Sequence, residues 1–117
     1  MRHRKEGKKF HRTTGDRRAF LRNLAGDLIR NGKIKTTEAR AKAIRPMVER
    51  FVSIAKKQTL SARRLLLSRL HNEAAVRKLY GDIAPRYAER NGGYLRISKT
   101  AKARKRDGTR VAVIEFI

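Results

Sequence analysis

The sequence predicts a two-layer α+β fold that carries a basic, disordered arm at its N-terminus. Three observations lead to this prediction. Four segments have the apolar spacing of amphipathic helices, and three shorter segments have the two-residue alternation or the β-branched, apolar composition of strands. The first residues carry dense positive charge with no period. A chain of 117 residues can bury one modest core. We therefore expect an extended arm over residues 1–15 and a single domain over residues 16–117.

The first helix is predicted after Thr14 and Asp16, either of which could cap its N-terminus. Its apolar residues fall on one face, namely Phe20, Leu21, Leu24, Ala25, Leu28 and Ile29. Gly32 stands where a glycine commonly ends a helix. Residues 33–36 then alternate and are rich in β-branched side chains, which predicts a short strand.

The longest helix is predicted over residues 38–58, with Thr37 as its cap. Pro46 lies within it, on the polar side. Because proline removes the hydrogen bond to the Lys42 carbonyl and disfavours helical geometry at Arg45, we expect a kink or a short break there. Two shorter helices are predicted over residues 61–70 and 72–83. Asn72 is expected to cap the second of them, and Pro85 is expected to end it.

The last third of the chain predicts two strands, over residues 94–99 and 110–116. A basic loop that ends in Asp107 and Gly108 joins them, so we expect an antiparallel hairpin. The strand over residues 33–36 can extend this hairpin to a three-stranded sheet that the helices cover on one face. The predicted order is one helix, one strand, three helices and two strands.

The charge of the chain points to an anionic partner. Thirty-two Lys and Arg residues oppose ten Asp and Glu residues, which gives a net charge of +22. This excess far exceeds what solubility requires, and nucleic acid is the first candidate to offset it. No zinc finger, base-reading helix or other sequence-reading module is present, so we expect recognition of phosphate and shape.

Three basic regions are candidate nucleic-acid contacts, and a plain solvated surface is the alternative for each. The arm and the start of the first helix supply Arg2, His3, Arg4, Lys5, Lys8, Lys9, Arg12, Arg17 and Arg18. The predicted hairpin supplies Tyr94, Arg96, Lys99, Lys102, Arg104, Lys105 and Arg106. The third region is the pair Arg63 and Arg64, with Arg69 nearby, for which a solvated face is as good an interpretation as binding.

Catalytic, metal and cofactor sites are not predicted. The chain has no cysteine, and its three histidines lack the spacing of metal ligands. Its acids lie mostly beside Arg or Lys, as surface ion pairs do, so we expect neither an enzyme nor a small-molecule substrate. The sequence also lacks an apolar stretch long enough for a signal peptide or a membrane span, and we expect a cytoplasmic protein.

Five collinear motifs narrow this interpretation. They are MRHRKEGKK (1–9), RNLAGDLIRNGKIKTT (22–37), AKAIRPMVE (41–49), RKLYGDIAPRYAERNGGYLRI (77–97) and DGTRVAVIEFI (107–117). In this order they resemble the bacterial large-subunit ribosomal protein L17 family over essentially the whole chain. The chain departs from the family pattern at Leu95, where threonine is usual, and at Ala43, where glutamate is more common.

The resemblance implies a structural constituent of the large ribosomal subunit that binds 23S-type rRNA. It implies a position near the exit of the peptide tunnel, beside other large-subunit proteins, and the same order of helices and strands. The rRNA contacts that it implies are Arg2, His3, Lys5, Lys8, Arg12, Arg22, Arg86, Tyr87, Tyr94 and Arg96. Two other classes remain open, a nucleoid-associated architectural protein that binds DNA and an RNA chaperone that binds many transcripts weakly.

Overall fold

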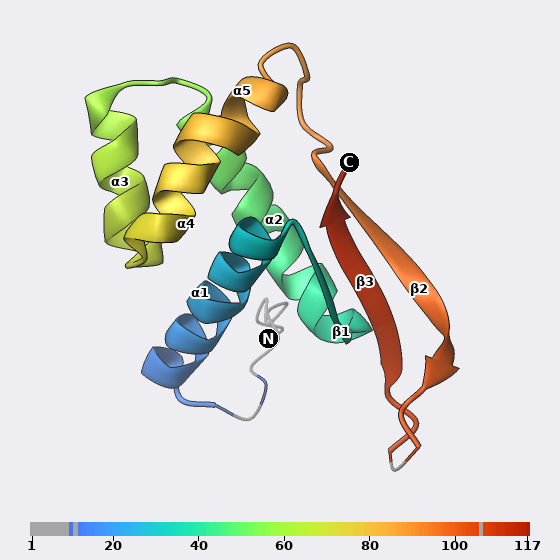
Figure 1. Cartoon of the computed structure of the whole chain (residues 1–117). Helices are drawn as coiled ribbons and strands as arrows, with labels where there is room; N and C mark the ends of the chain where they lie inside the picture. The colour runs from blue at the N-terminus through green and yellow to red at the C-terminus, as the bar shows by residue number, and fades with distance from the viewer. Residues whose placement is uncertain (1–9, 11, 106) are drawn as a thin grey trace, which may run out of the picture.

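Helices and strands occur in the predicted order (Figure 1). The computed structural model describes residue 10, residues 12–105 and residues 107–117, with only the backbone at residues 101 and 102. The elements are α1 (Thr14–Asn31), β1 (Lys33–Thr37), α2 (Glu38–Ala55), α3 (Leu60–Leu70), α4 (Glu73–Lys78), the π-helical turn η1 (Leu79–Ile83), α5 (Ala84–Arg86), β2 (Leu95–Ala103) and β3 (Arg110–Phe116). The predicted α+β class is confirmed.

The helix ends show which capping predictions were right. Thr37 and Asn72 cap α2 and α4, each accepting a hydrogen bond from a backbone N–H three residues later. Gly32 ends α1 in the left-handed conformation, with φ of +82°. The predicted cap of α1 was wrong: Thr13 caps it, so the helix begins at Thr14 and includes two residues that the prediction gave to the arm.

The helices depart from prediction in their lengths and at Pro85. Pro46 is exposed and does not break α2, which runs from Glu38 to Ala55, and the kink expected there stays a prediction. α1 and α2 are equally long, 18 residues each. Pro85 does not end the helical segment that α4 begins, because η1 and α5 carry it on to Arg86.

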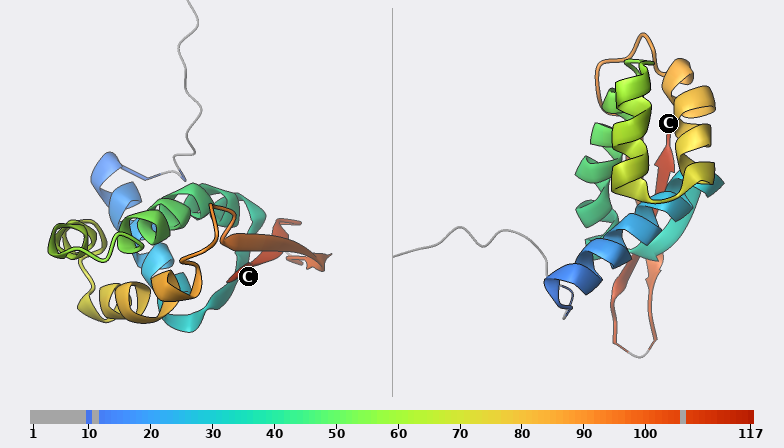
Figure 2. Two further views of the ribbon diagram at one scale, coloured as in Figure 1. Left: turned by 90° about the horizontal axis from the view of Figure 1, so that it is seen from above. Right: turned by 90° about the vertical axis from the view of Figure 1, so that its left-hand side faces the viewer.

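The three strands form an antiparallel sheet in the order β1-β3-β2. Ile114 in the central strand lies opposite Ile34 in β1 and Ile97 in β2. β2 is longer than predicted and continues to Ala103 after a register shift that follows Lys99. The hairpin of β2 and β3 therefore extends beyond the helices (Figure 2).

The core lies between the sheet and the helices, which all pack on one side of the sheet (Figure 2). α2 is the element that contacts the sheet most extensively, and α1, α3 and η1 pack against it. The largest fully buried side chains come from every layer, and include Leu28, Ile29, Ile44, Val48, Leu66, Leu79 and Ile114. Among the helices that the structure describes, none combines the length and apolar character needed to cross a bilayer.

Candidate nucleic-acid interface

The root of the arm is attached to α1 through one aromatic ring. The guanidinium of Arg12 lies 4.1 Å from the centroid of the Phe20 ring, and that of Arg40 lies 5.0 Å from it. The Phe10 ring centroid is 5.8 Å from the same ring. These cation–π and ring contacts place the start of the described chain against α1 and α2. The predicted contacts that lie outside the described residues are Arg2, His3, Arg4, Lys5, Lys8, Lys9 and Arg106.

A groove of about 670 Å³ opens between α1, α2 and α3. Three of the predicted residues, Arg17, Arg18 and Arg22, line it from α1. Arg50 from α2 and Arg69 from α3 also line it. In the described part of the chain, no carboxylate pairs with any of these five guanidinium groups. Their charge is therefore available to an anionic ligand, and we call this set the arginine groove.

The hairpin residues separate onto different surfaces because side chains alternate along a strand. Arg96 lies on the outer face of the sheet and pairs with Glu115 at 3.0 Å. Lys99 lies on the face that α2 covers and pairs with Glu38 at 3.4 Å. The side chain of Lys102 lies outside the described residues. The strand thus holds two of its predicted cations in ion pairs, on opposite faces.

At the hairpin tip, Arg104 and Lys105 are exposed. Arg104 pairs with Asp107 at 2.8 Å. The backbone N–H of Thr109 donates to Asp107 at 3.1 Å, and this bond, with the Arg104 pair, lowers the pKa of the carboxyl below its usual value. The ion pair fixes the turn and leaves Lys105 as the tip cation without a described carboxylate partner.

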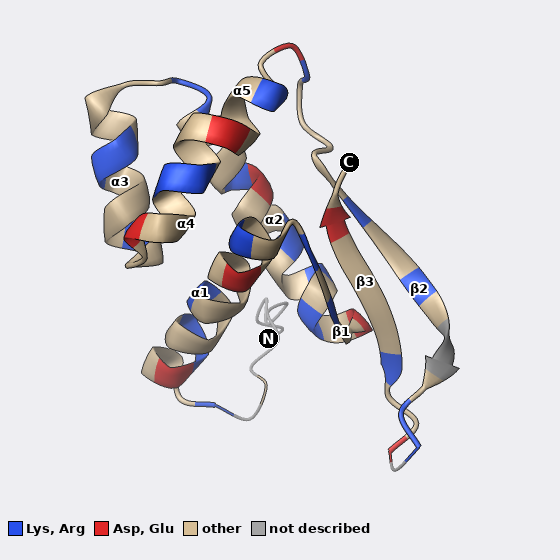
Figure 3. Cartoon of the chain, in the orientation of Figure 1, with Lys and Arg blue, Asp and Glu red and all other residues tan. Residues whose placement is uncertain are grey.

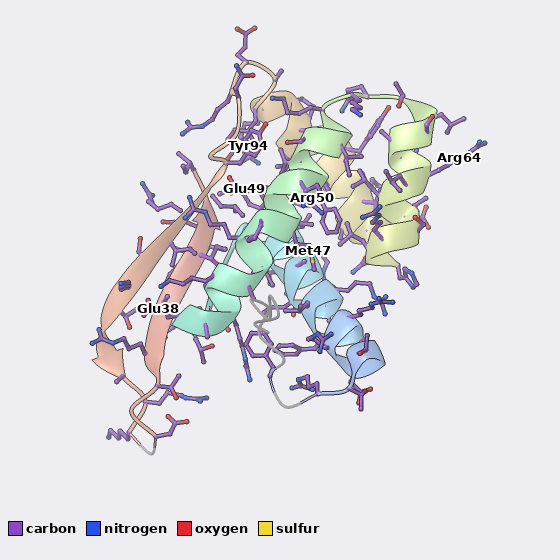
Figure 4. All side chains as sticks on the ribbon, turned by 180° about the vertical axis from the view of Figure 1, so that it is seen from behind. Glu38, Met47, Glu49, Arg50, Arg64 and Tyr94 are labelled. Atoms are coloured by element: carbon purple, nitrogen blue, oxygen red, sulfur yellow. The ribbon has the colours of Figure 1, made fainter. Side chains whose placement is uncertain are left out.

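The α3 pair does not join the groove. Arg63 is half-buried and Arg64 is exposed, and neither lines the arginine groove. Arg64 points outward from α3, whereas Met47 and Arg50 project from α2 on the side that faces α3 (Figure 4). Arg86 is likewise separate, and pairs with Asp82 at 3.5 Å.

The two predicted tyrosines lie in the core. Tyr87 is 5% exposed and Tyr94 is 2% exposed, and their ring centroids are 5.3 Å apart. The Tyr87 hydroxyl donates to the carbonyl of Ile117. Neither ring is therefore accessible for stacking with a base. The surface that the segment over residues 77–97 offers to nucleic acid comes from its charged residues.

The Tyr94 hydroxyl sits in a small polar network. It accepts a hydrogen bond from Lys56 at 3.0 Å and donates one to the Arg90 carbonyl at 3.2 Å. Burial alone would raise the pKa of this phenol, but the Lys56 ammonium and other donors outweigh it and hold the pKa below 10. The network joins α2 to the segment before β2.

Basic residues cover the helices and the hairpin, with few acids between them (Figure 3). Within the described ranges, no group of three or more His, Cys, Asp or Glu residues could hold a metal ion. A sequence model of the family described as ribosomal protein L17 matches residues 20–117. The chain belongs to the ribosomal protein L17 family.

Curated relatives span the whole chain. The large ribosomal subunit protein bL17 of Persephonella marina is 52% identical over 118 residues, which cover 100% of this chain and 95% of the relative. The protein of the same name from a Sulfurihydrogenibium species is 48% identical, with 100% and 97% covered. That of Allorhizobium ampelinum is 50% identical, with 100% and 82% covered.

Sequence reasoning missed two residues of this L17-family surface, Arg50 and Arg69. Arg50 was assigned to no candidate region, and Arg69 was considered only as a neighbour of Arg63 and Arg64, on a polar helix face where a solvated side chain is the ordinary interpretation. No local signal distinguishes them, because the groove forms only when three helices far apart in sequence pack together. Contact between nucleic acid and Arg17, Arg18 and Arg22 stays a prediction. The structure adds that these three side chains line the same groove.

Proposed function

We propose that this chain is a structural constituent of the large ribosomal subunit that binds 23S-type rRNA through phosphate and shape contacts. Membership of the ribosomal protein L17 family supports the assignment, as does the name of its relatives, large ribosomal subunit protein. The observation that carries the RNA-binding part is the arginine groove, where five guanidinium groups converge without a carboxylate in the described structure.

The chemistry of the groove suits phosphate. Guanidinium groups form paired hydrogen bonds with phosphate oxygens and remain charged at any physiological pH. Each contact releases a condensed counterion, so binding gains free energy that depends on salt. We assign the ordered cations of the groove and of the hairpin tip to positioning the protein on folded RNA.

The N-terminal arm is proposed to extend the RNA-binding surface beyond the folded domain. Residues 1–9 are proposed to extend from the domain, and the eight cations within the first eighteen residues are proposed to follow phosphates. If all eight met phosphates, the logarithm of affinity would fall with log salt at a slope of roughly −6 to −7. We further propose that the protein lies near the exit of the peptide tunnel, beside other large-subunit proteins. The proposed location is the cytoplasm, and we assign no enzyme activity.

Binding to protein-free large-subunit rRNA and to duplex DNA of matched length tests the proposal. Affinity is measured by filter binding with the full chain across a salt series. We expect tighter binding to the rRNA. Duplex DNA bound at least as tightly would favour the nucleoid-associated alternative, and weak binding that does not distinguish the rRNA from unrelated transcripts would favour an RNA chaperone.

A matched pair of double variants tests the groove. Arg50→Ala with Arg69→Ala removes two groove cations, and Arg77→Ala with Arg90→Ala removes two exposed cations that do not line it. We expect the groove pair to reduce the salt slope by about 1.4 to 1.8 and the control pair by less. Equal effects would show that charge alone, without the groove, determines binding.

A further inference from the structure

We propose that the arginine groove holds one unpaired nucleotide of the RNA, with its base on the apolar floor of the groove and its phosphates against the arginine rim. The proposal rests on the proposed function in taking RNA as the partner. It goes further by naming the structural state of the nucleotide that the groove accepts.

The floor of the groove is apolar. It is formed by Leu21, Ala43, Pro46, Met47 and Phe51. A duplex presents only phosphates and sugars to a surface of this size, and these would leave the floor in contact with water. A splayed-out base has two apolar faces that can cover the floor, and the polarizable thioether of Met47 suits an aromatic face.

The rim supplies the second half of the site. Five guanidinium groups from three different helices line the same groove, and among the described residues no Asp or Glu lines it. Arginine serves both parts of a nucleotide, since its plane stacks on bases and its N–H groups pair with phosphate. Arg50 and Met47 project from α2 on the same side, so that rim and floor meet there (Figure 4).

The groove also offers a neutral polar group. The hydroxyl of Ser68 lines it and donates to the Leu65 carbonyl at 2.7 Å. Its oxygen lone pairs remain able to accept from a ribose hydroxyl or a base N–H. A volume of about 670 Å³ lies within the roughly 300–1,000 Å³ typical of small-ligand pockets.

Charge decides between a nucleotide and a peptide segment as the occupant. A peptide would need several acidic side chains in close succession to match five arginines. A nucleotide carries two negative charges in its flanking phosphates, and each neighbouring nucleotide of the strand adds another within reach of the rim. We therefore assign the groove to RNA.

Fluorescence anisotropy with two end-labelled RNA hairpins tests this assignment. One hairpin is fully paired, and the other carries a single bulged adenosine in the same stem. At raised salt, we expect the full-length protein to bind the bulged hairpin about tenfold more tightly than the paired one. Ala43→Phe, which fills the floor without changing charge, should abolish this preference.

Two controls keep the test decisive. Ala74→Phe adds the same ring at an exposed site on α4 and should retain the preference. If the thermal transition shows that Ala43→Phe does not fold, Arg50→Ala replaces it and should weaken binding to the bulged hairpin more than to the paired one, unlike Arg90→Ala.

Equal affinity of the wild-type protein for the two hairpins would overturn the proposal. A preference that survives in Ala43→Phe would also overturn it. Either result leaves the proposed function standing if the protein still binds large-subunit rRNA, whereas failure to bind that rRNA would remove the proposed function itself.

Discussion

The side-chain amide of Gln58 donates a hydrogen bond of 2.9 Å to the backbone carbonyl of Tyr80. Tyr80 lies in the π-helical turn η1, where the N–H of Ala84 bonds to the carbonyl of Leu79, five residues earlier. The next bond of that pattern would join the N–H of residue 85 to Tyr80, but residue 85 is proline and has no N–H. Gln58 supplies the missing donor, which explains how the helical segment continues through Pro85.

This relationship predicts that Gln58→Ala lowers the free energy of unfolding by about 1 kcal/mol, because the Tyr80 carbonyl loses its donor. Gln58→Glu keeps the size of the side chain but also lacks the N–H, so it should lose a similar amount. Urea unfolding followed by circular dichroism measures both. A wild-type midpoint in Gln58→Ala would mean that the hydrogen bond contributes nothing to stability.

Tyr94→Phe separates a core role from an RNA-binding role. The variant loses the hydrogen bonds with Lys56 and with the Arg90 carbonyl, and we expect it to be about 1 kcal/mol less stable. Its RNA affinity should not change, because the ring is buried. Tyr80→Phe is the matched control, since no hydrogen bond of its hydroxyl occurs in the described structure. Weaker RNA binding by Tyr94→Phe at unchanged stability would contradict the core assignment.

Glu38 predicts a pH dependence of stability. Its carboxylate lies 2.9 Å from Lys42 and 3.4 Å from Lys99, and these ammonium groups, Lys42 first, hold its pKa below the ordinary 4.5. A pKa lowered by folding stabilises the folded state above about pH 4.5, and this stabilisation is lost as the pH falls through the folded value. The difference in unfolding free energy between wild type and Glu38→Gln should therefore grow as the pH rises towards 5 and then stay constant. A difference independent of pH would disprove the coupling.

The contacts of Phe20 predict different effects for two truncations. Deleting residues 1–9 should leave the cooperative thermal transition unchanged. Deleting residues 1–12 also removes the Phe10 and Arg12 contacts with Phe20, and should cost about 1 kcal/mol of stability. Both truncations should weaken incorporation into the large subunit. Loss of the cooperative transition on deleting residues 1–9 would show that arm and domain do not fold independently.

Local patterns were enough to predict most of the fold. The spacing of apolar residues in α1 and α2 and the alternation in β1 and β2 are strong signals because each of these elements buries one face against the core. The caps Thr37 and Asn72 followed from local chemistry. The misplaced end at Pro85 had a non-local cause, because the donor that compensates for the proline comes from Gln58, more than twenty residues earlier.

The site was less predictable than the fold. Charge indicated a nucleic-acid partner. Of the groove arginines, Arg17 and Arg18 were chosen as the end of the basic N-terminal stretch, and Arg22 because the family resemblance implied it. Tyr87 and Tyr94 show the limit of this reasoning, since a motif does not tell which of its side chains turn into the core. Arg50 and Arg69 join the groove only through the packing of α2 and α3 against α1.

The central claim is that this chain resides in the large ribosomal subunit, and sedimentation of a cell lysate through a sucrose gradient tests it most directly. The protein is followed by immunoblot, before and after a high-salt wash, with RNase and DNase treatment in parallel. We predict that it sediments with the large-subunit peak, stays there after the wash, and leaves that position only when RNase degrades the subunit. Recovery at the top of the gradient, or in material that DNase disperses, would contradict the account.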